Sequence, residues 1–597
     1  MTQFDRIDGK FVTTRKYEKD RFALKRAKWK YDFRRKHWWT ADEEKALLVK
    51  DWAIGAAKEY LDNALAIRQA AIDASWAEDT VAEFPAPEGL AYMPFQRAGI
   101  EYASKRSRTL IADPPGLGKT IQAIGLHNTK KLNKILIICP ASLKRNWKRE
   151  WERWDVHGLS VGQTASILHN DPVFMPNGGR ARDHRDKPIS KSRTEHFWPA
   201  ADVCIVNYDM LEAFDDQIKK VEWDLVICDE AHLLKTATSL RSMCVFGGER
   251  KASRKKGISK KVFTPIEAAH HLYLTGTPIL SKPSELWTII RACDPEGLGL
   301  NWRKYALTYC DAQESFGGLD SSGASNLEEL NRLLRERFMV RRDKQSVLKE
   351  LPDKNREMVL LPKDKLEAPV KKEQNRVENA LEAYEKSVLG IDTSNLFRYI
   401  DNLCDKLAAA LAEQSGEEPD WGEAVKTLSA PEQIMFTEIS SAREEVALAK
   451  VGLVVEHVEK LVQCGEPVIC FGYHKSVIKS IKERLEKKGI RVGVITGDVH
   501  PDKRQDIVDD FQDGHLDVIL GNIIAMGVGF TLTRARFVVF AELDWVPAMI
   551  EQAEDRAWRH GQLNAVLVQH LVVDGSIESR MAIALLEKMG VIKEALD

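Results

Sequence analysis

Short runs of apolar residues recur in two parts of the chain, and helix-like segments separate them. In the first part the runs are Thr109–Ala112, Ile135–Cys139, Val203–Val206, Leu225–Cys228 and Leu272–Leu274. In the second part they are Pro467–Phe471, Val492–Ile495, Val518–Leu520, Phe537–Ala541 and Val566–Val573. Near-continuous apolar strands alternating with helices are typical of a parallel sheet covered on both faces. We therefore predict an α/β fold with two parallel-sheet lobes.

The rest of the chain lacks this alternation. Residues 43–76 are Ala-rich with helical periodicity, Glu83–Glu88 carries two prolines, and residues 355–450 are strand-poor and helical in pattern. Two polar stretches, His157–Ala200 and Phe246–Lys261, interrupt the first lobe and are predicted as surface insertions. The predicted parts are a small accessory module (1–85), lobe one (86–354), a helical insert (355–450) and lobe two (451–597).

The charge of the chain is balanced overall but not locally. Its 597 residues hold 88 Lys and Arg against 89 Asp and Glu, which alone argues against a basic protein that coats nucleic acid. Residues 1–50, however, hold 15 basic against 8 acidic side chains, and residues 246–261 hold 7 against 1. The acidic stretch Glu413–Glu423 offsets part of this excess. Contact with a polyanion and an ordinary solvated loop are equally good interpretations of residues 246–261.

Composition also limits the compartment and the class of site. No stretch approaches the roughly 18 uncharged apolar residues of a membrane span, and the first residues lack the apolar core of a secretory signal. None of the 9 cysteines forms a Cys-x-x-Cys pair, which disfavours a zinc site. We expect no membrane partner, and a cytoplasmic protein of a bacterial or phage-infected cell, or a nuclear one in a eukaryote.

A phosphate-binding loop is predicted where the first apolar run ends. Asp113-Pro-Pro-Gly-Leu-Gly-Lys-Thr120 follows a strand and precedes a helix-like segment, as such a loop requires. The glycines let backbone amides close around a phosphate, Lys119 supplies a positive charge, and the Thr120 hydroxyl can ligate Mg²⁺. Asp113 replaces the usual leading glycine, and Pro114 and Pro115 have no amide to donate. The predicted cofactors are ATP and Mg²⁺, and the predicted loop contacts are Asp113, Gly116, Leu117, Gly118, Lys119 and Thr120.

A pair of carboxylates follows the fourth apolar run. Leu225-Val-Ile-Cys-Asp-Glu-Ala-His232 reads as a strand that ends in Asp229 and Glu230. Asp229 can hold Mg²⁺ through water, and Glu230 can polarise the attacking water. For His232 two interpretations stay open, namely coupling of this site to the rest of the cleft and a simple structural hydrogen bond.

Several segments resemble motifs of helicase superfamily two. Asp229-Glu-Ala-His232 is similar to the DEAH form of motif II, and Leu274-Thr-Gly-Thr-Pro278 is similar to motif III. Cys139–Glu150, Asn207–Leu211 and Met339–Lys344 with Leu348–Pro352 resemble segments of the SWI/SNF-type DNA translocases.

The most specific likeness is Gln552-Ala-Glu-Asp-Arg-Ala-Trp-Arg-His-Gly-Gln562, which matches the Gln-x-x-Asp-Arg-x-x-Arg-x-Gly-Gln pattern of those translocases. The preceding segments Ala525–Thr531 and Phe540–Trp545 look most like the SMARCAL/HARP-type annealing helicases. The chain departs from the family at Pro114 and Pro115, and at Trp558, where the family usually has His.

The resemblance implies two RecA-like lobes and a DNA-dependent ATPase that moves on duplex or branched DNA. By this match Arg556 and Arg559 are arginine fingers, Gln552 organises the same face, and Gln96 reads the adenine. The implied role lies in fork remodelling, annealing, recombination or repair. The expected partners are DNA rather than RNA, with a single-strand-binding or replication protein as a further candidate, and the chain is expected to be a monomer. Nucleic-acid contacts are expected at Lys144, Arg145, Lys475 and Gly527, mostly to phosphates.

Two alternatives stay open. An ATP-gated scaffold that recruits or displaces proteins on DNA would need the same nucleotide loop but would hardly move. At the beginning of the chain, Arg21–Trp39 interleaves cations with Trp29, Tyr31, Phe33, Trp38 and Trp39. These aromatic side chains could stack on bases, and the segment loosely resembles the small HARP element. The competing interpretation is a small self-packed domain with Trp in its core.

Overall fold

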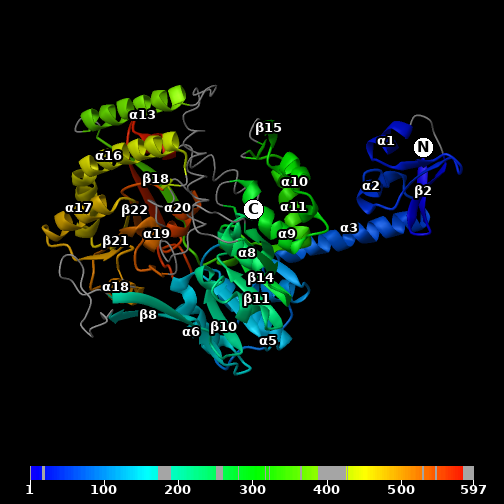
Figure 1. Cartoon of the computed structure of the whole chain (residues 1–597), viewed down its shortest axis with the longest axis horizontal. Coiled ribbons are helices and arrows are strands. Elements are labelled where there is room, and N and C mark those ends of the chain that lie inside the picture. The colour runs from blue at the N-terminus through cyan, green and yellow to red at the C-terminus, as the bar shows by residue number, and fades with distance from the viewer. Residues whose placement is uncertain are drawn as a thin grey trace, which may run out of the picture. The chain divides into compact units, whose positions relative to one another are not determined.

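A computed structural model describes residues 2–15, 20–172, 190–250, 260–279, 282–315, 318–321, 323–362, 366–387, 425–426, 428–499, 501–526, 530–544 and 547–582. Gly527 and the acidic stretch Glu413–Glu423 lie outside these residues. The chain divides into two units, Met1–Trp76 with Arg335–Arg337, and Ala77–Leu334 with Phe338–Asp597. The larger unit contains both lobes, whose elements are labelled in Figure 1.

Lobe one is built on a parallel sheet of seven strands in the order β17-β5-β14-β11-β6-β10-β7. Each of the five predicted apolar runs is a strand of this sheet, and the runs at its centre are almost entirely buried. The strands are β5 Arg108–Ile111, β6 Ile135–Cys139, β7 Val161–Gln163, β10 Val203–Asn207, β11 Trp223–Asp229, β14 Ala268–Leu274 and β17 Met339–Val340.

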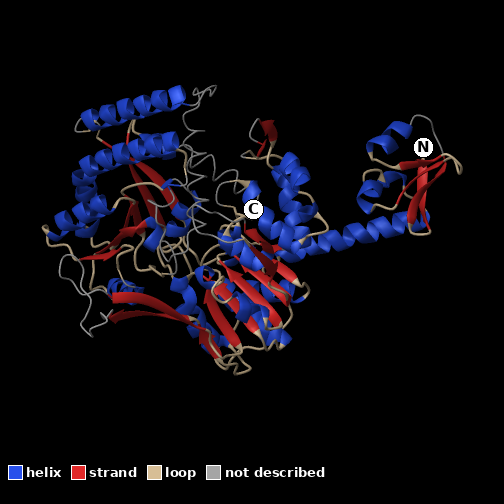
Figure 2. Ribbon diagram, in the orientation of Figure 1, coloured by secondary structure: helices blue, strands red, loops and turns tan. Residues whose placement is uncertain are grey.

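Helices lie on both sides of this sheet (Figure 2). They are α4 Pro94–Ser104, α5 Lys119–Lys130, α6 Lys144–Trp154, α7 Asp215–Lys219, α8 Leu240–Phe246, α9 Trp287–Cys293, α10 Trp302–Tyr309, α11 Leu327–Arg337 and α12 Lys344–Val347. Such a parallel arrangement brings the carboxyl ends of the strands, and the loops that follow β5, β11 and β14, to one edge.

Lobe two has a second parallel sheet of six strands in the order β18-β23-β22-β19-β21-β20. The strands are β18 Lys354–Leu361, β19 Val468–Gly472, β20 Val492–Ile495, β21 Val518–Asn522, β22 Phe537–Phe540 and β23 Val566–Val573. The helices are α13 Glu367–Ser387, α16 Ala430–Gln463, α17 Lys475–Glu486, α18 Pro501–Gln512, α19 Ile523–Met526 and α20 Pro547–Glu554.

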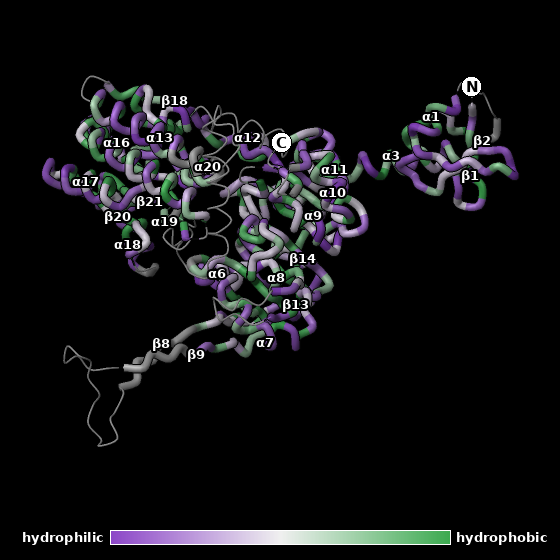
Figure 3. The backbone as a smooth tube through the Cα atoms, turned by 45° about the horizontal axis from the view of Figure 1, so that its top comes forward, coloured by the Kyte–Doolittle hydropathy of each residue, from purple (hydrophilic) through white to green (hydrophobic). Residues whose placement is uncertain are grey.

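Alternate residues of the strands enter two hydrophobic clusters, so the sheet is buried on both faces. Helix α17 alternates hydrophilic residues with buried Val477, Ile478, Ile481 and Leu485 (Figure 3). The predicted α/β class with two parallel-sheet lobes is confirmed.

The predicted start of the helical insert at residue 355 is wrong. Lys354–Leu361 forms the edge strand β18, which pairs in parallel with β23 from Lys354↔Val566 to Leu361↔Val573. Its first four residues, Lys354–Glu357, are polar, and the apolar run Met358–Leu361 is too short to distinguish a strand from the helical pattern that follows. The described helices α13 and α16 agree with the predicted helical pattern. Because α16 buries Val446, Val451 and Val455 against the sheet, it belongs to the core of lobe two.

The two predicted insertions contain antiparallel hairpins. In the first, β8 (Ala165–Pro172) pairs with β9 (Ser190–Phe197). Both strands are rich in polar residues, which hides them from a search for apolar runs. In the second, β12 (Gly247–Arg250) pairs with β13 (Lys261–Pro265). Arg250 lies 2.8 Å from Glu212, and Lys261 lies 3.6 Å from Asp215, so the cations at the base of this hairpin are already paired.

The smaller unit is a separate packed module. Its four antiparallel strands are β1 Gln3–Ile7, β2 Lys10–Arg15, β3 Lys30–Asp32 and β4 His37–Thr40, in the order β1-β2-β4-β3. Helices α1 Arg21–Arg26, α2 Glu43–Leu47 and α3 Gly55–Trp76 complete the module. Trp29 and Trp38 belong to its core together with Phe4 and Phe11, whereas Phe33 is 83% exposed. The aromatic residues predicted to stack on bases therefore divide into core and surface groups.

No helix among the described residues combines the length and the apolar character that a bilayer crossing needs.

We expect Trp29→Ala to destabilise the smaller unit by about 3–5 kcal/mol, because it leaves a cavity in a small core. It also removes the 2.9 Å hydrogen bond from the Trp29 indole to the Lys45 carbonyl. Amide hydrogen exchange of residues 2–76 in increasing urea measures the change. Phe33→Ala is the matched control, and an equal loss in both variants would contradict the assignment of Trp29 to the core.

Candidate nucleotide site

The predicted phosphate-binding loop joins β5 to the first turn of α5. Helix α5 begins at Lys119, and Gly118 before it has a left-handed backbone with a φ of 70°. A side chain at Gly118 would place its Cβ 2.4 Å from Gln96 Nε2, so only glycine lets the loop approach that residue. The loop amides and the N-terminus of α5 together form the kind of site that binds phosphate.

Asp113 points into the lobe. Its carboxylate is fully buried, lies 2.7 Å from Arg342 Nη1 and accepts a 2.9 Å hydrogen bond from Gln122 Nε2. Its carbonyl accepts a 2.9 Å hydrogen bond from Lys119 Nζ. The carboxylate predicted to bind the cofactor is therefore engaged in holding the loop to the protein.

The proline pair also has a structural partner. A Cβ at Gly276, which follows β14, would lie 2.7 Å from Pro115 Cδ. Pro115 therefore rests directly on the Thr275–Thr277 turn, and the absence of a side chain at Gly276 makes that approach possible. Gln96 lies on the other side of the loop, where its Nε2 donates to the Leu117 carbonyl at 3.4 Å. The Leu117 side chain is buried, which leaves only its backbone for a ligand.

Two carboxylates end β11 near Lys119, a buried one on Asp229 and a half-buried one on Glu230. Burial raises the pKa of Asp229, and the adjacent Glu230 carboxylate raises it further. For Glu230, burial also acts to raise the pKa, but His232, Lys119 and Arg556 outweigh it and hold the pKa below its ordinary value. Burial lowers the pKa of Lys119, and Glu230 and Asp229 oppose that shift. The physical result is an ionised Glu230 next to an Asp229 whose charge is poorly compensated.

Two aromatic residues hold Asp229 in place, and sequence reasoning missed both roles. Trp147 Nε1 donates a 2.7 Å hydrogen bond to Asp229 Oδ2, and Tyr208 Oη donates one of 2.7 Å to the Asp229 carbonyl. Both belong to segments that were singled out only for their family likeness. An available signal was the position of Trp147 on the same helical face as Trp151 and Trp154, all three of which are buried.

Glu230 has an unusual backbone. Its φ of 50° and ψ of 48° lie in the left-handed region, which non-glycine residues rarely adopt. Such a conformation at a candidate catalytic residue is a form of local strain. His232 Nδ1 lies 3.3 Å from Glu230 Oε2 and 3.0 Å from Thr275 Oγ1. His232 thus joins the carboxylate to the Thr275–Thr277 turn by polar contacts, and its coupling role stays a prediction.

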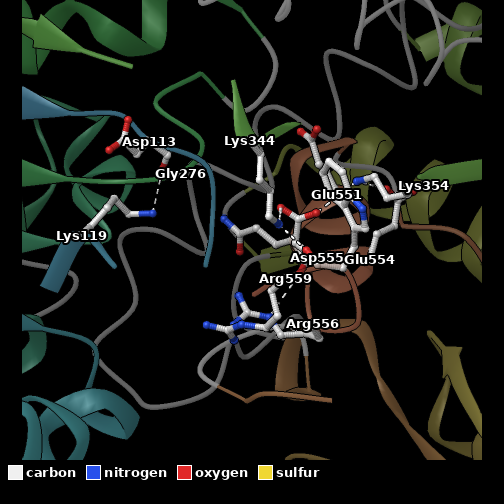
Figure 4. Close-up of polar contacts among 12 residues, drawn as sticks. Asp113, Lys119, Gly276, Lys344, Lys354, Glu551, Glu554, Asp555, Arg556 and Arg559 are labelled. Atoms are coloured by element: carbon white, nitrogen blue, oxygen red, sulfur yellow. Dashed lines mark hydrogen bonds and ion pairs between the residues drawn. The ribbon is translucent and has the colours of Figure 1, made fainter. Parts of the chain in front are cut away.

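Lobe two supplies two guanidinium groups to the same place. A Cβ at Gly116 would lie 3.0 Å from the Cβ of Arg559, so Arg559 lies directly against the phosphate-binding loop. Both Arg556 and Arg559 point toward the side of Figure 4 that holds Lys119. Among the described residues, no carboxylate lies within ion-pair distance of either. Burial and the neighbouring Arg559 lower the pKa of Arg556 to about 10. This unbalanced positive charge suits an anion.

Gln552 connects the two lobes directly. Its Nε2 donates a 2.8 Å hydrogen bond to Thr277 Oγ1, in the turn that also contacts His232 and Pro115. The structure thus brings Lys119, Glu230, Arg556 and Arg559 together and links them through Gln552. Thr120 and Asp229 are the candidate Mg²⁺ ligands, and one hydroxyl with one carboxylate fits a metal that takes its other ligands from phosphate and water. No cluster of three or more His, Cys, Asp or Glu suited to a metal occurs among the described residues.

The predicted nucleic-acid contacts are not gathered in one place by any described contact. Lys144 Nζ donates a 3.0 Å hydrogen bond to the Thr164 carbonyl, and Arg145 is exposed on α6. Lys475 is 62% exposed but lies 2.8 Å from Asp498. Gly527 lies outside the described residues.

Comparison with known proteins gives two family matches. The profile of the SNF2-related domain matches residues 95–405, and that of the helicase conserved C-terminal domain matches residues 450–561. A core of the SWI2/SNF2 ATPase from Sulfolobus solfataricus, solved in complex with dsDNA, aligns over 86% of this chain and 94% of that chain, with a TM-score of 0.35 and 21% identity.

Curated relatives match most of this chain. The SWI/SNF-related matrix-associated actin-dependent regulator of chromatin subfamily A-like protein 1 of Xenopus tropicalis is 30% identical over 511 residues, which cover 85% of this chain and 45% of the relative. The DNA annealing helicase and endonuclease ZRANB3 of Bos taurus is 32% identical over 501 residues, which cover 82% and 39%. The chain therefore spans less than half the length of these relatives.

We expect Arg342→Met to destabilise lobe one by about 3–5 kcal/mol, because it leaves the buried Asp113 carboxylate without its cation. Amide hydrogen exchange of residues 108–130 in increasing urea measures the loss. The double variant Asp113→Asn with Arg342→Met should lose less, since no charge is stranded. As a control, Met in place of the exposed Arg491 should change stability by no more than about 1 kcal/mol. Equal losses for the Arg342 and Arg491 variants would contradict the argument.

Proposed function

The chain belongs to the SNF2-related family, and from this premise we propose that it is a DNA-dependent ATPase that couples hydrolysis to movement on duplex or branched DNA. The observation that carries the proposal is the approach of Arg559 to Gly116, which places an arginine of lobe two on the phosphate-binding loop of lobe one. Neither lobe alone holds a complete set of groups for phosphoryl transfer to water.

Each group of the site has a defined task in this reaction. The loop amides and Lys119 bind the β- and γ-phosphates, and Gln96 holds the loop at the side where we place the adenine. Glu230 orients and polarises the attacking water, and its lowered pKa keeps it ionised. Arg556 and Arg559 stabilise the charge on the transferring phosphoryl group. Mg²⁺ held by Thr120 and Asp229 would neutralise the phosphate oxygens.

Movement follows from the shared site. Because Gln552 of lobe two binds Thr277 of lobe one, closing of the lobes also engages the turn that contacts His232. Hydrolysis is thereby coupled to lobe closure, as in other enzymes that complete a site by domain motion. We propose that Lys144, Arg145, Lys475 and Gly527 contact the phosphate backbone, which a motor must grip without regard to sequence.

The relatives support DNA as the substrate along which the chain moves, since one is named a regulator of chromatin and another a DNA annealing helicase. We further propose that residues 1–85 act as an accessory nucleic-acid module. Trp39 carries this proposal, because Lys10 Nζ lies 4.6 Å and Lys30 Nζ 5.4 Å from the centre of its ring. A ring flanked by two cations can stack on a base while the cations contact phosphate.

We expect Lys119→Ala, Glu230→Gln and Arg556→Ala each to lower ATP turnover by at least about 10³-fold, because each removes a group that acts on the transferring phosphoryl group or on water. Steady-state phosphate release measures turnover without nucleic acid and with single-stranded DNA, duplex DNA, forked DNA or RNA. Lys105→Ala and Arg491→Ala, on exposed surfaces, are the matched controls.

Duplex or forked DNA should stimulate the wild-type chain most. Equal rates under all five conditions would contradict the DNA translocase and favour the ATP-gated scaffold. Wild-type turnover in Glu230→Gln would remove Glu230 from the mechanism.

We expect Trp39→Ala with Lys30→Ala to weaken binding to forked DNA by about 1–3 kcal/mol, with a smaller dependence of affinity on salt. Fluorescence anisotropy with a labelled fork at several salt concentrations measures the change. Ile67→Ala, an exposed apolar residue of the same unit, is the control. Unchanged affinity in the double variant would show that this face does not bind DNA.

A further inference from the structure

The segment between the two sheets makes specific contacts with the arginines of lobe two. We call residues 341–353, between β17 and β18, the connector, and residues 552–562 the arginine segment. Lys344 of the connector donates to the Trp558 carbonyl and lies 3.2 Å from Asp555 Oδ2. In the other direction, Trp558 Nε1 donates a 2.6 Å hydrogen bond to the Pro352 carbonyl. Both ends of the connector are thus bound to one turn of the arginine segment.

Trp558 is the centre of these contacts. Two ammonium groups approach its ring, with Lys344 Nζ 4.5 Å and Lys354 Nζ 4.7 Å from the ring centre. The side chain is only 8% exposed. Trp offers a larger π-face to a cation than the His that usually stands at this position in the SWI/SNF-type translocases. The departure at position 558 therefore has a physical partner in the connector.

Three cations pair with two carboxylates around this turn. Lys344, Lys354 and Arg356 face Glu554 and Asp555, and Lys354 lies 2.9 Å from Glu554 and 3.1 Å from Asp555 (Figure 4). All of these groups except Arg356 are nearly inaccessible to water. Buried charges that are paired in this way hold their geometry tightly, because separating a pair leaves an uncompensated charge.

Arg559 is the next residue after Trp558. The Trp558 carbonyl that accepts from Lys344 belongs to the peptide group that also carries the Arg559 amide. The side chain of Arg559 then reaches the phosphate-binding loop, where its Cβ would be 3.0 Å from a Cβ at Gly116. A displacement of the turn would move Arg559 by a similar distance, and misplacement of a catalytic group by about 1 Å can lower a rate by about 10²-fold.

We propose that Lys344 and Trp558 are positioning residues that hold Arg559 against the phosphate-binding loop through the connector. Among the described residues, no hydrogen bond or ion pair joins either side chain to the phosphate-binding loop, so both act through Arg559. The proposal rests on the function proposed above, because the effect of Arg559 on turnover is what the two residues control.

The charge of Lys344 gives the proposal a pH dependence. Burial lowers the pKa of Lys344 to about 8, while Asp555 opposes the shift and Lys354 and Arg559 add to it. The ammonium that binds Asp555 is therefore lost as the pH rises through about 8. A neutral Met at position 344 lacks this step, so the ratio of wild-type to Lys344→Met turnover should shrink between about pH 7 and pH 9.

The experiment compares Lys344→Met, Trp558→Ala and Trp558→His in the full chain. We expect kcat for ATP hydrolysis with duplex DNA to fall by about 10-fold or more in Lys344→Met and Trp558→Ala, with a smaller fall in Trp558→His, and KM for ATP to change by less than about threefold. In the Arg559→Ala background, Lys344→Met should have no further effect, because a residue that acts through Arg559 has nothing left to position.

Two control variants and one measurement of hydrogen exchange separate this proposal from its alternatives. Lys488→Met, an exposed lysine paired with Glu459, and Trp302→Ala, in an aromatic cluster of lobe one, are the matched controls and should leave kcat unchanged in folded protein. Amide hydrogen exchange of residues 553–562 should be faster in Lys344→Met, a readout that does not depend on ATP turnover.

If the wild type hydrolyses ATP and Lys344→Met has the same kcat, the positioning role is overturned and the proposed function stays intact. The positioning role would also be overturned if Lys344→Met lowered kcat equally in the Arg559→Ala and wild-type backgrounds. Unchanged amide hydrogen exchange of residues 553–562 in Lys344→Met would overturn it as well. A wild-type chain without turnover would instead contradict the proposed function, and the exchange measurement would still decide whether Lys344 holds the turn.

Discussion

The buried ion pair between Asp113 and Arg342 is the interaction on which the candidate site depends. A carboxylate and a guanidinium with almost no exposure to water must remain paired, because either one alone would be strongly destabilised in the interior. Asp113 is the first residue of the phosphate-binding loop, and Arg342 is the second residue of the connector. The pair therefore joins the loop that would bind nucleotide to the segment that leads to lobe two.

The residues around Arg342 extend this connection in both directions. Arg341 donates to the Ala112 carbonyl at 2.8 Å and to the Gly276 carbonyl at 3.2 Å, so it supports the strand end and the turn beneath Pro115. Lys344 binds the turn that precedes Arg559. Three residues close together in the sequence, Arg341, Arg342 and Lys344, thus contact the carbonyls beneath the loop, its first carboxylate and the arginine segment. Rearrangement of the connector cannot leave any of these three unchanged.

The sequence made the central strands and the chemical groups of the site predictable, because both leave local marks. A strand buried on both faces must be apolar throughout, as in Ile135–Cys139, and a phosphate-binding loop must carry glycines and a lysine at fixed spacing. The edge strand β18 left a weaker mark, because its first four residues are polar and its apolar run Met358–Leu361 is short. Trp147 and Trp558 were likewise unpredictable in their roles, since a tryptophan that holds Asp229 and one that binds two lysines look the same in a sequence as a core residue.

The left-handed backbone of Glu230 bears on how this chain can change over generations. A residue held at a φ of 50° lowers the stability of its fold by about 1–3 kcal/mol relative to glycine at the same place. Substitution by glycine at this position would therefore be favoured by selection for stability and opposed by selection for chemistry. A lineage that no longer needed the reaction would be expected to lose Glu230 early, well before it lost the sheet that carries it.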